Sequence, residues 1–202
     1  MSTTSATIDM RLDAPAANLF LLLARAFQPP SEFNEDEPRL LREALATCGP
    51  DLAAVGLDLA AQWVDALHVD PAPLLRDYAR LFLGPFEIKA APYASFYLDP
   101  EQRLMGAVSQ EVACRYAEAG LAPAEGPCDA PDHIVSECEF LYFLAHQYLT
   151  IEDEIWHQRF DDFLQTHFAQ WLPGLADAML ATEDLHPFYR ALARFCQRLV
   201  SP

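Results

Sequence analysis

Apolar residues recur along most of this chain at the spacing of one face of an α-helix. The clearest stretch places them at i, i+1, i+4, i+7 and i+8, between residues that typically start and stop helices. Asp70 can cap the first free amides, and Pro71 suits the first helical position. Gly84 can adopt the left-handed conformation that ends a helix, and Pro85 blocks its continuation. The pattern predicts a helix whose apolar stripe consists of Leu74, Leu75, Tyr78, Leu81 and Phe82.

The same period predicts helices over most of the remaining chain. The helix that Asp132 opens is apolar on nearly all sides, which indicates a central and buried helix. Apolar positions between Phe188 and Leu199 predict the last helix. No stretch has the convincing alternation of a β-strand. Further helices are expected at about 14–27, 37–47, 52–68, 107–120, 154–171 and 172–182.

Two stretches rich in proline interrupt the helical pattern. Residues 84–101 form a loop too long for a simple connection, and long ordered loops often carry function. Residues 121–131 have the Pro, Gly and Ala composition of a hinge. We expect an all-α fold, a bundle of about ten helices in two closely packed lobes, with residues 1–120 before the hinge and 132–202 after it. The aromatic residues of the first loop are Phe86, Tyr93, Phe96 and Tyr97.

Charge narrows the range of partners. The chain has 202 residues, of which 30 are acidic and 13 basic, and its formal net charge is -17. Such a field repels nucleic acid and anionic lipid and attracts basic ligands. Excess carboxylates also keep a protein with 52% hydrophobic residues in solution. Steering of a basic partner and simple solubility both remain open as explanations.

Cysteine usage and the first residues favour a soluble protein of the cytoplasm. The five cysteines are an odd number without a Cys-x-x-Cys pair, which disfavours a disulfide scaffold and a zinc ribbon. No basic cluster precedes an apolar segment near Met1, as a secretory signal would require. The apolar run from Leu19 to Ala24 is far shorter than the roughly 20 residues of a membrane span. We therefore expect a cytoplasmic location and no membrane-spanning segment.

Two Glu-x-x-His tetrads raise the alternative of a metal-dependent enzyme. This spacing, on helices that face the inside of a bundle, forms di-iron carboxylate sites. Glu154 and His157 lie within a predicted helix. Glu183 and His186 do not, because His186 directly precedes Pro187, which disfavours helical geometry at the histidine and indicates a helix start. The second tetrad therefore fails, and we expect no metal site.

Other catalytic motifs are missing from the sequence. There is no Gly-x-Ser-x-Gly elbow for a serine nucleophile, no phosphate-binding Gly-x-x-x-x-Gly-Lys-Ser/Thr loop and no Gly-x-Gly-x-x-Gly after a strand. We expect no catalytic residues and no cofactor.

The segment from Pro131 to Glu137 starts the buried helix with polar residues. Pro131 restricts the entry of the chain, Asp132 can cap the helix, and His133 lies one turn from Glu137. An ion pair between His133 and Glu137 is possible at this i, i+4 spacing. Considered alone, the segment is typical of a capped helix start with a surface ion pair.

Five motifs follow one another along the second part of the chain. They are Asp77-Tyr-Ala-Arg-Leu-Phe-Leu-Gly-Pro85, Ala91-Pro-Tyr-Ala-Ser-Phe-Tyr-Leu-Asp99, Pro131-Asp-His-Ile-Val-Ser-Glu-Cys-Glu-Phe140, His167-Phe-Ala-Gln-Trp171-Leu-Pro and His186-Pro-Phe-Tyr-Arg-Ala-Leu192. In this order they resemble the motifs of the TorD/DmsD/NarJ family of redox-enzyme maturation chaperones. The similarity runs from about Asp77 to Leu199, while the N-terminal third agrees only as amphipathic helix. Each motif alone is moderately specific, and their succession is more specific.

This resemblance implies a chaperone and not an enzyme. Its partner would be the catalytic subunit of a molybdoenzyme of the dimethyl sulfoxide reductase family, bound through the twin-arginine signal peptide, the apo form or both. Binding would assist insertion of the molybdenum cofactor and delay export. The chaperone would be a monomer or a homodimer that exchanges lobes. The chain differs from the family pattern at Asp77, Tyr93 and Cys138, so the client enzyme stays open.

The resemblance also implies a peptide-binding site, in a groove between the aromatic loop and the start of the Asp132 helix. We place most weight on Asp132, His133, Phe86 and Tyr97, with Glu137 as the expected partner of His133. A generic protein-interaction module is the second alternative, beside the metal-dependent enzyme. The matching positions are Tyr78, Leu81, Phe82, Gly84, Pro85, Phe86, Tyr97, Pro131, Asp132 and His133.

Overall fold

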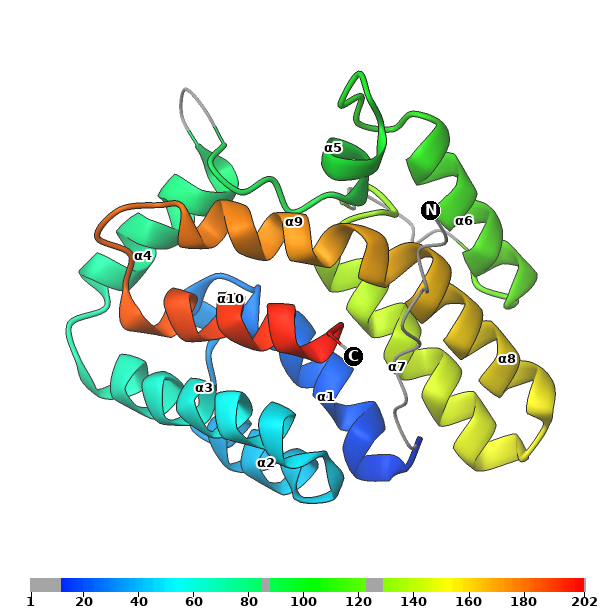
Figure 1. Cartoon of the computed structure of the whole chain (residues 1–202), viewed down its shortest axis with the longest axis horizontal. Helices are drawn as coiled ribbons and strands as arrows, with labels where there is room; N and C mark the ends of the chain where they lie inside the picture. The colour runs from blue at the N-terminus through cyan, green and yellow to red at the C-terminus, as the bar shows by residue number, and fades with distance from the viewer. Residues whose placement is uncertain (1–11, 85–87, 123–128, 202) are drawn as a thin grey trace, which may run out of the picture.

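Helices make up the whole regular structure of the part described by the computed structural model, residues 12–84, 88–122 and 129–201 (Figure 1). These residues contain ten α-helices and no strand, which confirms the predicted all-α class. The helices are α1 (Ala14–Ala26), α2 (Glu37–Ala44), α3 (Pro50–His68), α4 (Ala72–Tyr78), α5 (Ala94–Leu98), α6 (Ala107–Glu118), α7 (Ile134–Ile151), α8 (Glu154–Phe163), α9 (Ala169–Leu180) and α10 (Pro187–Leu199). Short 3₁₀ turns η1 (Pro30–Glu32) and η2 (Leu45–Thr47) and π turns η3 (Ala79–Leu83) and η4 (Leu164–Phe168) complete them.

One hydrophobic core connects helices from both ends of the chain. Helix α1 lies along α7, and α3 lies along α10, while α9 and α10 run side by side in Figure 1. Phe20 of α1 meets Phe160 of α8 edge to face, with ring centroids 5.5 Å apart. Trp63 of α3 meets Phe188 of α10 in the same way at 5.5 Å. The division into lobes at residues 121–131 stays a prediction.

Polar caps fix several of the helix starts that the sequence predicts. The carboxylate of Asp13 accepts the N–H of Ala16 at 2.9 Å, and that of Asp70 accepts the N–H of Ala72 at 3.0 Å. Gly84 ends the turn after α4 as predicted and has a positive φ of 37°, but its ψ of 111° differs from that of the left-handed helical conformation expected there. Pro85, the predicted block, lies outside the described residues.

The structure differs from the sequence-based helix assignment in two places. Residues 84–101, expected to be a loop, contain α5, whose five residues are too few for a helical period to be recognised. Continuous helical structure from Glu154 to Leu180 replaces two helices that were expected to meet at residues 171 and 172. The irregularity is the π turn η4, and Pro173 lies inside α9 without ending it.

Candidate peptide-binding site

Asp132 joins the start of α7 to the segment around α5. Its side chain is fully buried, with one carboxylate oxygen accepting the N–H of Ser95 at 2.8 Å and the other accepting the hydroxyl of Ser109 at 2.5 Å. The two backbones also pair, because Ala94 donates to the carbonyl of Asp132 and Ile134 donates to that of Pro92, each at 2.9 Å. Asp132 therefore holds α5, α6 and α7 together.

The prediction that Asp132 caps the buried helix is wrong. His133 is the N-cap residue of α7, and its Nδ1 accepts the N–H of Val135 at 3.3 Å. The carboxylate of Asp132 is instead committed to the buried donors of Ser95 and Ser109, which would otherwise have no acceptor for their N–H and O–H groups.

The predicted surface ion pair between His133 and Glu137 is also wrong. Glu137 is fully buried, and its Oε1 lies 2.7 Å from Nε2 of His167 in η4. Its Oε2 accepts the indole N–H of Trp171 at 2.8 Å. Burial raises the pKa of the Glu137 carboxyl above its ordinary value, although the contacts with His167 and Trp171 oppose this shift. Glu137 thus links α7 to η4 and α9 inside the core.

Tyr78, Tyr93 and His133 form a partly exposed surface beside these buried contacts, here called the tyrosine–histidine surface. The rings of Tyr93 and His133 meet edge to face with centroids 5.0 Å apart, and the two residues form an isolated antiparallel bridge. Burial raises the pKa of the Tyr78 hydroxyl, and the charges of Asp129 and Glu32 add to the shift. The three side chains come from separate parts of the sequence.

Asp129 supplies negative charge to all three members of the tyrosine–histidine surface. It raises the pKa of Tyr93 in addition to the effect of burial. Burial lowers the pKa of His133, and the charges of Asp129 and Asp132 oppose that shift. Asp129 is exposed, whereas Asp132 is buried. The surface therefore combines aromatic rings with an exposed acidic rim.

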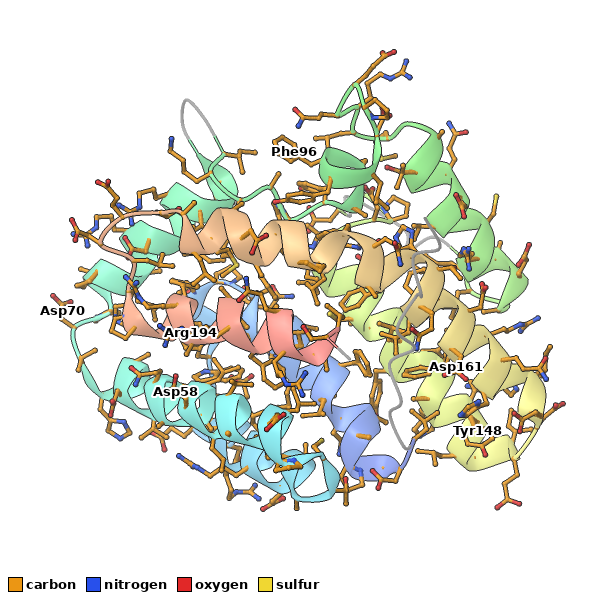
Figure 2. All side chains as sticks on the ribbon, viewed as in Figure 1. Asp58, Asp70, Phe96, Tyr148, Asp161 and Arg194 are labelled. Atoms are coloured by element: carbon orange, nitrogen blue, oxygen red, sulfur yellow. The ribbon has the colours of Figure 1, made fainter. Side chains whose placement is uncertain are left out.

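Tyr97 fixes α5 to α9. Its ring stacks on Trp171 with centroids 5.8 Å apart and an interplanar angle of 23°. Gly174 permits this approach, because a Cβ atom there would lie 2.9 Å from Cδ1 of Tyr97. Burial raises the pKa of the Tyr97 hydroxyl. Phe96, labelled in Figure 2, also belongs to α5, and its ring centroid lies 5.3 Å from that of Tyr97.

The remaining predicted site residues lie in different environments. Leu81 and Phe82 are buried in the core, with 0% and 5% exposure. Gly84 and Pro131 are half-buried, and the carbonyl of Pro131 accepts the hydroxyl of Tyr116 at 2.8 Å. Of the predicted residues, Tyr78 and His133 are thus partly exposed, and the ring of Tyr78 packs on the buried Phe82. The predicted residues Pro85 and Phe86 lie outside the described residues.

Sequence reasoning missed Tyr93, Asp129 and Glu32 as members of this site. The sequence identifies Tyr93 as an aromatic residue of the first loop and as a departure from the family pattern, but not as a site residue. A signal for it exists in hindsight, because an aromatic residue follows Pro92 in a long loop. No local signal marks Asp129 or Glu32, since their position depends on chain segments brought together by the fold.

The two Glu-x-x-His tetrads occupy unlike positions. His157 faces Glu154 at 3.6 Å and Asp161 at 3.1 Å on the surface of α8. His186 instead caps α10, with its Nδ1 accepting the N–H of Phe188 at 3.2 Å, which confirms the predicted helix start. Across the part of the chain that the structure describes, no group of at least three His, Cys, Asp or Glu side chains is arranged to hold a metal ion.

The helices of the described residues are also too short or too polar for a membrane span.

The described residues therefore form a helical fold that presents the tyrosine–histidine surface with its acidic rim. Buried contacts of Asp132 and Glu137 hold the helices around this surface together. The chain belongs to the nitrate reductase delta subunit family, whose model matches residues 50–177. This confirms the resemblance to the TorD/DmsD/NarJ family.

Individual relatives agree with this family. The chain is 30% identical over 125 residues to the chaperone protein TorD of Vibrio cholerae serotype O1, an alignment that covers 60% of this chain and 56% of that protein. It is 24% identical over 151 residues to the Tat proofreading chaperone DmsD of Salmonella typhi, with 69% and 70% covered. A crystal structure of a redox enzyme maturation protein from Archaeoglobus fulgidus has the same fold, with a TM-score of 0.55, 19% identity and coverage of 94% and 98%.

Proposed function

We propose that this chain is a cytoplasmic chaperone, without catalytic activity or a cofactor, that binds the twin-arginine signal peptide of a molybdoenzyme. The apo form of the catalytic subunit is a further target, and binding assists cofactor insertion and delays export. The tyrosine–histidine surface with its acidic rim is the observation that carries the proposal. A twin-arginine signal peptide combines a basic segment with an apolar one, so its chemistry complements this surface. The names of the TorD and DmsD relatives support the same role.

Within the predicted site, we assign contact with the peptide to the partly exposed side chains. Tyr78, Tyr93 and His133 offer aromatic surface, and Asp129 and Glu32 attract the basic segment. Arginine side chains bind favourably over tyrosine faces and pair with carboxylates in the same place.

The buried members of the predicted site act through support of this surface. Asp132 fixes the backbone that carries His133, and Glu137 anchors the first turns of α7 to α9. Phe82 packs against Tyr78 with ring centroids 5.4 Å apart, and Leu81 is fully buried in the core beside it in sequence. Substitution of these residues is expected to weaken binding through the fold.

Peptide titration tests the proposal. Wild-type protein is titrated with molybdoenzyme signal peptides from the same genome and with versions in which both arginines are changed to glutamine. We expect binding that requires the arginines and weakens as salt rises, because salt screens the acidic rim. Tyr93→Ala and Asp129→Asn should weaken binding more than Asp58→Asn does. Asp58→Asn is a matched loss of one negative charge on α3, which α9 and α10 separate from α5 in Figure 2. Failure of every such peptide to bind would contradict the proposal.

The two alternatives make different predictions in the same experiments. A metal-dependent bundle enzyme would contain iron or manganese in elemental analysis of the purified protein. A generic interaction module would bind the arginine and glutamine peptides equally well. Whether the chaperone is a monomer or a homodimer is decided by light scattering with and without peptide.

A further inference from the structure

A buried acidic residue, Asp77, connects α4 to the turn before α10. Its side chain is 1% exposed, and Oδ2 accepts the backbone N–H of His186 at 2.8 Å, across 109 positions of sequence. Arg80 reinforces this connection from η3, because its guanidinium donates to the carbonyl of Glu183 at 2.8 Å. The same guanidinium lies 3.5 Å from Oδ1 of Asp77. Both ends of the 183–186 segment are therefore held by neighbouring residues of a single helical stretch.

That stretch also carries Tyr78. The π turn η3 begins directly after Tyr78 and closes with the N–H of Gly84 donating to the carbonyl of Ala79 at 2.8 Å. A π turn has i→i+5 hydrogen bonds in place of the usual i→i+4 bonds, and such turns occur frequently at functional sites. Asp77 lies in α4, two residues before this irregular segment, and Arg80 is the second residue of the segment.

The connection is electrostatically incomplete. Oδ1 of Asp77, Nε of Arg80 and the hydroxyl of Tyr189 are buried without a hydrogen-bond partner among the described residues. The negative charge of Asp77 lies 3.5 Å from the guanidinium nitrogens of both Arg76 and Arg80, which is too long for a good hydrogen bond. Buried polar groups with unmet hydrogen bonds are few in native proteins, so each of them needs a physical explanation.

We propose that Asp77 and Arg80 are positioning residues of the peptide site. Together they clamp the 183–186 segment to η3 and so fix the position of Tyr78 in the tyrosine–histidine surface. This inference rests on the proposed function, because it treats Tyr78 as a contact residue for the peptide.

The clamp is tested with Arg80→Gln and Asp77→Asn. Arg80→Gln removes the positive charge and the guanidinium group that donates to the carbonyl of Glu183. Asp77→Asn keeps an oxygen for the N–H of His186 and removes the negative charge. Arg76→Gln is the matched control, since Arg76 also lies 3.5 Å from Oδ1 of Asp77 but has an exposed side chain and donates no described hydrogen bond to the 183–186 segment.

Two measurements are made on each variant. In protein without peptide, the amide of Gly84 should exchange its hydrogen about tenfold faster in Arg80→Gln and Asp77→Asn, while amides in the middle of α7 exchange as in wild type. Peptide affinity should fall about tenfold in the same two variants. Arg80→Lys and Asp77→Glu keep the charge, so they should bind the peptide more tightly than the neutral variants do. Arg76→Gln should change both quantities less than twofold, in keeping with an exposed pair.

The outcomes separate this inference from the proposed function. If wild-type protein binds no peptide, the proposed function fails, and faster exchange at Gly84 still supports the clamp. If wild type binds and the variants bind equally well with unchanged exchange at Gly84, the positioning role is overturned. Equal effects of Arg76→Gln and Arg80→Gln would also overturn it, because any loss of nearby charge would then suffice. If Asp77→Asn fails to fold in circular dichroism, Arg80→Gln and Arg80→Lys decide the question.

Discussion

The carboxylate of Asp132 accepts the backbone N–H of Ser95 at 2.8 Å, although the two residues are 37 positions apart. The contact is buried and is accompanied by a second hydrogen bond from the hydroxyl of Ser109. It joins the segment that carries Tyr93 to the segment that carries His133. The geometry of the tyrosine–histidine surface therefore depends on a carboxylate that is not itself exposed.

Replacement of Asp132 by alanine should lower the free energy of unfolding by about 2–4 kcal/mol, because it leaves two buried donors without an acceptor. Ser109→Ala removes only one of these hydrogen bonds and should lower it by about 1–2 kcal/mol. Urea denaturation followed by circular dichroism measures both. An Asp132→Ala variant as stable as wild type would show that the contact with Ser95 contributes nothing to the fold.

His133 gives the stability of the protein a specific dependence on pH. Burial lowers the pKa of His133 in the folded state below its ordinary value of 6.5, although Asp129 and Asp132 oppose the shift. The unfolded chain therefore takes up the proton first, so this contribution is complete above pH 6.5 and is lost as pH falls towards the folded-state pKa. His133→Asn keeps a capping oxygen and removes the titration.

The difference in unfolding free energy between wild type and His133→Asn should thus become less favourable to wild type as pH falls through about 6.5. Urea denaturation at a series of pH values measures it. His146→Asn, at an exposed position of α7, controls for the general loss of a histidine. A difference that stays constant with pH would rule out a shifted histidine at this cap.

The sequence predicts the fold where local signals are strong. Helices start beside Asp70 and at His186 as their sequence context indicates, because the side chains that accept the first free amides lie within a few residues of those amides. The periodic apolar positions locate the long helices for the same local reason. Helix α5 cannot be recognised in this way, because its five residues give no measurable period. Contacts with residues far away in the sequence hold it in place.

Prediction of the site fails where partners come from distant segments. Spacing at i, i+4 suggests that Glu137 pairs with His133, yet the buried face of α7 directs Glu137 to His167 and Trp171, 30 and 34 positions away. Asp132 is similarly drawn from its own helix start to Ser95. The family resemblance correctly identifies the motifs of the family. Only the fold shows that acidic residues of these motifs join segments that are distant in the sequence.

Glu137 should be more sensitive to deletion than to a neutral replacement. Glu137→Ala leaves the side chains of His167 and Trp171 without their buried acceptor and should lower the free energy of unfolding by about 3–5 kcal/mol. Glu137→Gln retains one acceptor and nearly the same volume, so it should lower it by a smaller amount, about 1–3 kcal/mol. Urea denaturation, with the tryptophan emission spectrum as a second probe, measures both. Equal losses for the two variants would mean that the hydrogen bond to Trp171 does not matter.

Gly174 lies within α9, where alanine ordinarily stabilises a helix by about 1 kcal/mol relative to glycine. Here the new Cβ atom would lie 2.9 Å from Cδ1 of Tyr97, a distance that forces the ring or α5 to move. Gly174→Ala should therefore destabilise the protein. In a Tyr97→Ala background the obstruction is gone, so the same change should become neutral or stabilising, with a coupling free energy of about 1–3 kcal/mol between the two positions. Tyr97→Phe keeps the ring and should preserve the clash. Urea denaturation of the single and double variants measures the coupling, and independent, additive effects would show that the packing of Tyr97 does not require glycine at this position.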